Sequence, residues 1–204
     1  MSRIAHRVET ERLIMRNWSV DDAEAYRALL DRGDLALRPW IPWMRDEPMS
    51  LEATRERLLR HSRDFELGVN FRYPVFLHDG SLIGETGLYT RAGDGARETG
   101  YLIDSAHAGK SYASEAAMAM VRIAFEVDGV DRIELHCVPE NAASNRVALK
   151  LGCQLEATLR RRTRGSDGVL RDSCVWSLFA SGYAASPSAA LPVSAFAADG
   201  TQLL

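Results

Sequence analysis

Residues 100–116 read Gly100-Tyr101-Leu102-Ile103-Asp104-Ser105-Ala106-His107-Ala108-Gly109-Lys110-Ser111-Tyr112-Ala113-Ser114-Glu115-Ala116. This stretch predicts a strand that runs into a short loop of small residues, and the loop opens directly into a helix. Such a loop presents backbone N–H groups at the positive end of a helix dipole, which suits a phosphate or pyrophosphate. A strand–loop–helix connection with glycine is also common for structural reasons alone, so both interpretations stay open. Neither GxxxxGK[ST] nor GxGxxG is present, which argues against a P-loop or Rossmann site.

The segments on either side predict a mixed α/β domain around one central sheet. Ala113, Ala117 and Met120 recur in steps of four and three, which predicts a helix over 109–127 whose small-residue face packs against a sheet. The other expected strands are 11–16, 71–77, 82–89, 97–103, 132–138, 154–163 and 169–179, and the other expected helices are 19–33, 51–68 and 142–151.

The end of the chain differs in composition from the rest. After Tyr183 the sequence consists mainly of Ala, Ser and Pro, with no periodic apolar pattern. We therefore expect one domain over residues 1–183, followed by a flexible tail over residues 184–204.

Composition and charge disfavour several classes of protein. The 204 residues are 46% hydrophobic and 26% charged, as in an ordinary globular domain, and the net charge of −3 disfavours a nucleic-acid partner. No apolar run approaches the ~20 residues of a membrane span, and the N-terminus lacks a signal-peptide core. We therefore expect no membrane partner and a cytoplasmic location. Cys137, Cys153 and Cys174 are far apart and odd in number, so we expect neither a metal site nor a disulfide framework.

Three further segments stand in order around the loop, at 9–16 (ETERLIMR), 38–43 (RPWIPW) and 141–152 (NAASNRVALKLG). Together with residues 107–116 they resemble the GNAT acetyltransferase superfamily, and within it the RimJ/RimL-like N-acetyltransferases. The pyrophosphate loop of that family reads approximately H-x-G-K-G-Y-A-[ST]-E-A, and residues 107–116 here read HAGKSYASEA. The resemblance covers roughly residues 8–180.

The resemblance implies a GNAT-like fold, with a central, mostly antiparallel sheet of six to seven strands flanked by helices. It also implies that acetyl-CoA is the acyl donor. The residues that it assigns to the donor are Leu102, Ile103, Asp104, Ala108, Gly109, Lys110, Ser111, Tyr112, Ala113, Ser114, Asn141 and Asn145. Ser111 stands where the family usually has a second glycine. Its side chain either crowds the pyrophosphate or supplies a further hydrogen bond.

The family's reaction is direct attack of an amine on the thioester, which requires a proton acceptor for the amine and a donor for the thiolate. Glu98 is the expected base, because several GNAT enzymes have a glutamate on the strand before the loop; the alternative is a carboxylate that merely faces solvent. Glu85 is the reserve candidate on the acceptor side. The glutamate that some RimL-like proteins carry on the sixth strand is Thr163 here.

The expected proton donor is Ser144. Many superfamily members use a tyrosine on the helix after the fifth strand, and the matching position here is Ala148. RimL-like proteins resemble one another in having a serine one helical turn before that position instead, and Ser144 matches it. The alternative is that Ser144 is only a capping or surface residue. Asn141 is expected to cap the same helix as well as to contact the donor.

Two aromatic residues and one basic run complete the candidates. Trp40 and Trp43 either line the acceptor cleft or anchor a proline-rich loop in the core. The run at 160–164 (RRRTR) is either the solvated face of a strand or a surface that attracts an acidic protein terminus or the phosphates of CoA.

The resemblance leaves the class of acceptor open. The leading candidate is a protein or peptide N-terminal α-amine, including that of a ribosomal protein. A small amine such as a polyamine, an amino acid or an aminoglycoside is the close alternative, and a non-catalytic acyl-CoA-binding module is the third. The family also leads us to expect a homodimer.

Overall fold

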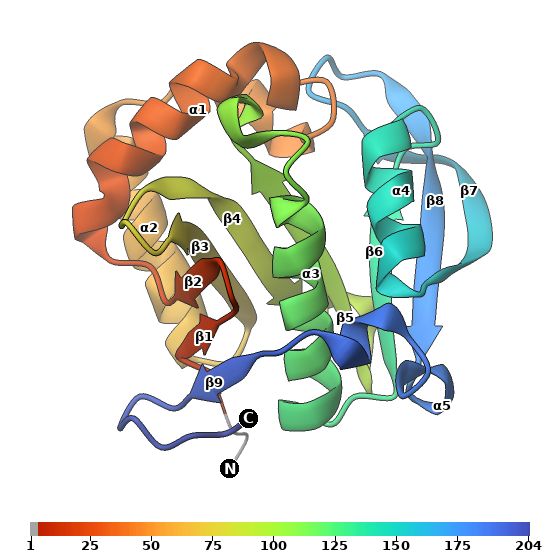
Figure 1. The fold of residues 1–204 in the computed structure, drawn as a ribbon. Helices are drawn as coiled ribbons and strands as arrows, with labels where there is room; N and C mark the ends of the chain where they lie inside the picture. Colours follow the sequence, from red (N-terminus) through yellow and green to blue (C-terminus); the bar gives the residue numbers. More distant parts are fainter. Residues whose placement is uncertain (1–3) are drawn as a thin grey trace.

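The computed structural model describes residues 4–204, so the first three residues of the N-terminal stretch lie outside it. Within the described part, nine strands form one sheet in the order β7-β8-β6-β5-β4-β3-β2-β1-β9. Figure 1 shows α3 and α4 in front of this sheet, α2 behind it and α1 along its upper edge.

The strands are β1 (Arg7–Glu9), β2 (Leu13–Arg16), β3 (Asn70–Leu77), β4 (Leu82–Tyr89), β5 (Ala96–Ile103), β6 (Arg132–Cys137), β7 (Gln154–Arg164), β8 (Leu170–Phe179) and β9 (Ser194–Phe196). The helices are α1 (Ala23–Leu37), α2 (Leu51–Glu66), α3 (Tyr112–Arg122), α4 (Ala142–Leu151) and the short α5 (Ala180–Tyr183). Single turns include η2 (Pro42–Asp46), η3 (Thr90–Ala92), η4 (Ser105–His107), the π-turn η5 (Ile123–Val127) and η6 (Pro187–Ala190). Among these helices, none is both long and apolar enough to cross a membrane.

The mixed α/β fold and the mostly antiparallel sheet are confirmed, since β5 and β6 form the one parallel pair among the described strands. The expected number of strands is too low. The opening strand is divided into β1 and β2 by a tight turn in which the Thr10 N–H donates to the Leu13 carbonyl at 2.9 Å. The ninth strand comes from the segment expected to be a tail.

The expectation of a flexible tail over residues 184–204 is wrong, because this segment adds a strand to the sheet. β9 pairs antiparallel with β1, and Ala195 is fully buried at that join. Ser188 is also fully buried, and its hydroxyl donates to the Leu151 carbonyl at 2.8 Å. Small side chains that looked like low-complexity sequence allow η6 to pack closely against α3 and α4. The fold therefore includes this segment.

Two apolar clusters fill the space between the sheet and its helices. The first joins α3, with Ala117 and Met120 fully buried, to the central strands. The second joins α1 to the other side of the sheet through Leu29, Leu30 and Leu102. The small face of α3 that the sequence predicts is thus confirmed as a packing surface.

The parallel pair β5–β6 is short, and its ends separate. Cα partners run from Ala96↔Arg132 to Thr99↔Leu135 and stop there. Beyond that point β5 stays paired with β4, and β6 stays paired with β8. The edges of Gly100–Ile103 and His136–Cys137 that face each other therefore enclose a gap in the sheet.

Candidate functional site

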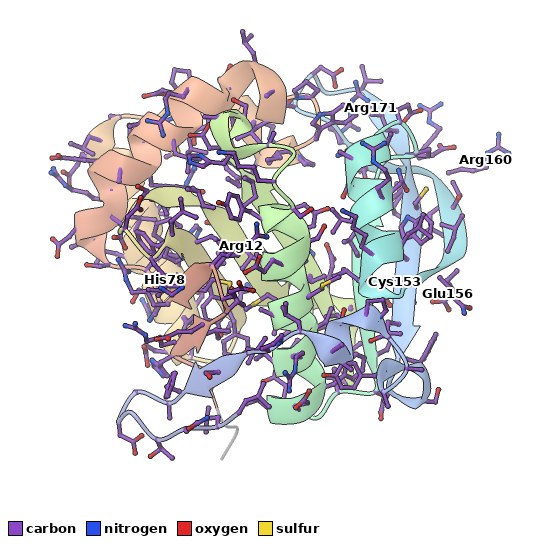
Figure 2. The ribbon with its side chains drawn as sticks, in the orientation of Figure 1. Arg12, His78, Cys153, Glu156, Arg160 and Arg171 are labelled. Carbon is purple, nitrogen blue, oxygen red and sulfur yellow. The ribbon has the colours of Figure 1, made fainter. Side chains whose placement is uncertain are left out.

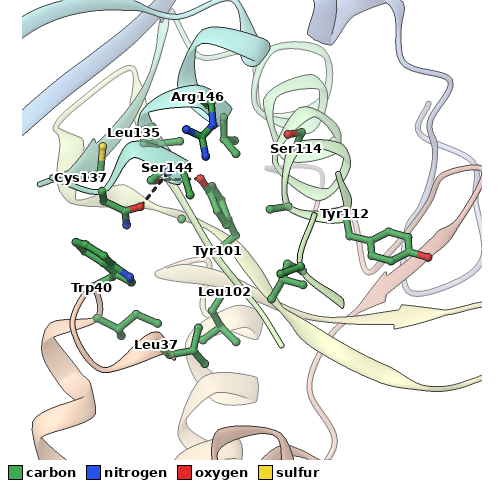
Figure 3. A pocket seen from close by; sticks show the side chains of 18 of the residues that line it. Leu37, Trp40, Tyr101, Leu102, Tyr112, Ser114, Leu135, Cys137, Ser144 and Arg146 are labelled. Carbon is green, nitrogen blue, oxygen red and sulfur yellow. Dashed lines mark hydrogen bonds between the residues drawn. The ribbon is translucent and has the colours of Figure 1, made fainter. Parts of the chain in front are cut away.

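A cavity of about 590 Å³ lies at this gap. Its walls come from the end of β5, the end of β6, the loop before α3, the start of α4 and the end of α1. In Figure 3 the ring of Tyr101 stands in the middle, with Trp40 and Leu37 on one side and Tyr112 and Ser114 on the other. The cavity thus connects the loop before α3 with an apolar wall from the α1 end.

The loop before α3 has the backbone geometry of an anion site. Gly109 has φ +77° and Ser111 has φ +63°, so the chain turns sharply and enters α3 at Tyr112. This turn directs N–H groups of the first helical turn toward the cavity, where the helix dipole favours negative charge.

Asp104 fixes the start of this loop without lining the cavity. Its carboxylate accepts the Ala106 N–H at 3.0 Å and an Arg32 N–H at 2.9 Å. Burial opposes the charge of Asp104, but these two hydrogen bonds outweigh it and hold its pKa below the usual value. Asp104 therefore positions the loop, and it does not line the cavity in which the donor is expected.

A second ion pair holds the other end of the loop. The guanidinium of Arg12 binds the carboxylate of Glu115, which also accepts the Thr10 hydroxyl at 2.6 Å. Arg12 also donates to the Lys110 carbonyl at 3.1 Å and lies 4.6 Å from the centre of the Tyr112 ring. Figure 2 shows Arg12 between the N-terminal strands and α3. The motif residue Glu115 thus anchors α3 to the turn between β1 and β2.

The left-handed backbone conformation of Ser111 explains why glycine is usual at this position. A left-handed backbone conformation costs a residue with a side chain roughly 1–2 kcal/mol. Its hydroxyl lies 3.4 Å from Nζ of Lys150, which lines the cavity together with Arg146. The serine is therefore part of a polar and basic side wall of the cavity.

The start of α4 is organised by two asparagines. Asn141 is confirmed as the helix cap, because its Oδ1 accepts the Ser144 N–H at 3.0 Å. Asn145 donates to the carbonyls of Val138, Pro139 and Asn141, and its Oδ1 accepts the Trp176 indole N–H at 2.8 Å. Since its polar atoms are all engaged, Asn145 holds the β6–α4 turn in place of binding a ligand.

Most of the expected donor residues meet at the cavity. Those that line it are Leu102, Ile103, Ala108, Gly109, Ser111, Tyr112, Ala113, Ser114 and Asn141. Asp104, Lys110 and Asn145 do not line it. Of the other candidates, Ser144 and Trp40 line the cavity. Trp43 instead packs against Arg57, whose guanidinium carbon lies 5.1 Å from the centre of the Trp43 ring.

Neither candidate glutamate lines the cavity. Glu98 is buried and accepts two N–H groups of Arg91, at 2.6 Å and 2.5 Å. Glu85 is buried on the α1 side, where it accepts from Arg72 at 3.1 Å and from the Tyr26 hydroxyl at 3.2 Å. Both carboxylates are held by internal partners, so the structure gives neither of them direct access to a substrate.

Ser144 has a partner that the sequence analysis did not single out. Its Oγ lies 3.0 Å from the phenolic oxygen of Tyr101, which projects from β5 into the cavity (Figure 3). Burial raises the pKa of Tyr101 well above its usual value. The tyrosine is therefore a neutral hydroxyl, and either it or Ser144 can be the donor in this hydrogen bond.

Three other cavity residues were also missed. The Thr99 hydroxyl is buried and has no hydrogen-bond partner within residues 4–204. Cys137 is an unreactive thiol, because burial raises its pKa to about 11. His136 follows the last β5–β6 pair. In the sequence, the position of His136 and Cys137 at the end of an expected strand is the signal that could have pointed to them.

The basic run lies away from this cavity. Arg160, Arg161 and Arg162 form an exposed bulge in the edge strand β7, opposite Asp172, whose carboxylate accepts the Arg161 N–H at 2.8 Å. Figure 2 shows Arg160 projecting outward from that edge. Within residues 4–204 no group of three or more His, Cys, Asp or Glu residues is arranged to hold a metal ion.

A gap between two parallel strands, with a helix start that suits an anion beside it, can hold a phosphate-bearing ligand whose remaining part enters the sheet. A family model described as an acetyltransferase (GNAT) domain matches residues 12–154. The chain belongs to the GNAT acetyltransferase family. It is accordingly an N-acetyltransferase that takes its acetyl group from acetyl-CoA.

Individual relatives agree with this assignment. The chain is 31% identical over 157 residues to the uncharacterized N-acetyltransferase YoaA of Bacillus subtilis, covering 76% of this chain and 86% of that protein. Mycobacterium smegmatis RimJ in complex with CoA-disulfide superposes with a TM-score of 0.78 at 21% identity, covering 91% of this chain and 92% of RimJ. Ribosomal-protein-S5-alanine acetyltransferase from Vibrio fischeri has a TM-score of 0.74 at 23% identity, covering 85% and 96%. The two structures show the same fold.

Proposed function

We propose that this enzyme acetylates the N-terminal α-amine of a protein or peptide. The observation that carries the proposal is the cavity, which runs from the phosphate loop through the gap in the sheet to the apolar wall at Trp40. The wall is open enough that the Trp40 side chain is 43% exposed, which suits the first residues of an extended chain. Structural neighbours that are named as ribosomal-protein acetyltransferases support this choice of acceptor.

The residues of the cavity divide the work between donor and acceptor. The loop at Gly109–Ser111, with Arg146 and Lys150, would hold the phosphates of acetyl-CoA by N–H groups and positive charge. The open edges of β5 and β6 would receive the pantetheine arm. Ser144, backed by Tyr101, would donate a hydrogen bond to the departing sulfur. Glu98 remains a proposed participant through its negative charge, behind the cavity wall.

Donor binding is expected to stabilise the fold. Acetyl-CoA at ~100 times its dissociation constant adds about 2.7 kcal/mol to the free energy of unfolding. For a domain of this size the melting temperature should rise by roughly 5–10 °C. The measurement is a thermal melt with acetyl-CoA, with adenosine and acetate as controls. A melting temperature that acetyl-CoA leaves unchanged would contradict the proposed donor site.

The class of acceptor is tested by comparing peptides with small amines as substrates. Purified enzyme is assayed for CoA release with a panel of peptides and, in parallel, with polyamines, amino acids and aminoglycosides. We expect at least tenfold higher kcat/KM for peptides, and acetylation at the α-amine by mass spectrometry. The same preference for any small amine would assign the enzyme to the alternative class. The homodimer and the cytoplasmic location stay predictions from the sequence.

A further inference from the structure

We propose that His136 is the catalytic base that takes a proton from the acceptor ammonium. It lies on β6, directly after Leu135, the last β6 residue paired with β5, and it lines the cavity. Side chains alternate along a strand, and Glu98 pairs with Glu134 across the sheet, so His136 shares the face of Glu98. Tyr101 is three residues from Glu98 and points to the opposite face, where Ser144 lies. The gap connects the two.

The hydrogen bonds around His136 leave one ring nitrogen available. Its Nε2 lies 2.7 Å from Oε2 of Glu134, and Arg132 holds Oε1 of the same carboxylate at 2.7 Å. A carboxylate accepts, so the neutral imidazole carries its proton on Nε2 and keeps a lone pair on Nδ1. This is the form required of a base, oriented by a carboxylate on its far side.

The surroundings of Nδ1 favour a cation. Nδ1 lies 3.8 Å from Oε2 of Glu98, too far for a hydrogen bond between them. The charged groups around the ring are Glu134 and Arg132 from β6, Glu98 from β5, and Arg91 from η3, which binds Glu98. An ammonium at Nδ1 would experience the negative charge of Glu98. Glu98 would act through this charge from behind the cavity wall, where Arg91 binds it, and not by direct contact.

The proton transfers balance with these groups. The acceptor ammonium gives one proton to Nδ1 of His136, and the neutral nitrogen then attacks the thioester carbonyl carbon. The C–S bond breaks as the amide forms, and the second proton of the former ammonium ends on the sulfur, which Ser144 and Tyr101 stabilise as it leaves. His136 returns its proton to water, since about one third of its side chain is exposed (32%).

His136→Gln tests the proposal, with His78→Gln on the β3–β4 turn as the matched control. We expect kcat at pH 7 to fall at least tenfold while the KM for acetyl-CoA stays within twofold. A peptide α-amine has a pKa of about 8, so at pH 9 most of it is already neutral. The deficit should therefore shrink to within threefold at pH 9. A kcat within twofold of the wild type at pH 7 would overturn the proposal, as would an equal deficit at both pH values.

A second measurement does not depend on the acceptor. The nitrogen-15 shifts of the His136 ring should show the proton on Nε2 and an unprotonated Nδ1, with a change in Glu134→Gln. A proton on Nδ1 in the neutral ring would also overturn the assignment. The proposal rests on amine acetylation and not on the peptide class. If peptides fail and a small amine is acetylated, the same variants are assayed with that amine at pH 7.

Discussion

Ser144→Ala is expected to lower kcat about 100-fold and to leave the affinity for acetyl-CoA nearly unchanged. The serine lines the cavity at the start of α4, and its hydroxyl lies 3.0 Å from the hydroxyl of Tyr101. A hydrogen bond to the departing sulfur strengthens as negative charge develops there, and removing such a donor typically costs 10²–10³-fold in rate. Single-turnover kinetics with preloaded acetyl-CoA would separate the chemical step from product release.

Two variants make this result specific. Tyr101→Phe should lower kcat by about tenfold, because it removes the partner of Ser144 and leaves the serine itself. Ser62→Ala on α2, where the hydroxyl accepts only from Asn17 at 3.3 Å, should leave kcat unchanged. If Ser144→Ala retains kcat within threefold of the wild type, the serine has no part in the chemical step.

Glu85→Leu is expected to reduce stability by about 3 kcal/mol and the melting temperature by roughly 6–12 °C. The residue is 3% exposed, and its carboxylate accepts from Arg72 and from the Tyr26 hydroxyl in the space between α1 and the sheet. Burial, with the negative charge of Glu85 beside it, raises the pKa of Tyr26, so the phenol stays protonated and donates. Removing Glu85 leaves the guanidinium of Arg72 without its counterion, and an uncompensated buried charge is costly.

The double variant Arg72→Met/Glu85→Leu should recover most of the lost stability, since it removes both charges together. Glu24→Gln is the matched control, because that side chain is 77% exposed and its loss should change the melting temperature by less than 2 °C. Thermal melts and the acceptor KM are measured on the same samples. A raised acceptor KM with an unchanged melting temperature would restore Glu85 to its expected role in substrate binding.

The loop at 107–116 and its helix could be predicted from the sequence because their determinants are local. A strand pattern, small residues and a 3.6-residue apolar period follow one another there, and each is readable within a few positions. The same holds for Asn141 as a helix cap, since a cap acts on residues within the same turn. The residues that form the loop before α3 could therefore be predicted from the sequence alone.

The prediction of a flexible tail is wrong because amino-acid composition does not record which parts of the fold a segment contacts. Residues 184–204 contain few large apolar side chains, and nothing local indicates that β1 offers them a free edge. The pairing depends on contacts across most of the chain. Small residues then become an advantage, because they fit closely against α3.

The sequence by itself thus determined the order of the helices and strands from β2 to β8 and the position of the loop before α3. Only the tertiary structure decided which polar groups are available for chemistry. Glu98 and Glu85 look like free carboxylates in the sequence, but Arg91 and Arg72 bind them in the fold. Tyr101 and His136 become cavity residues because β5 and β6 separate after Thr99↔Leu135. The physical reason is that hydrogen bonding and burial depend on partners distant in sequence, which no local pattern records.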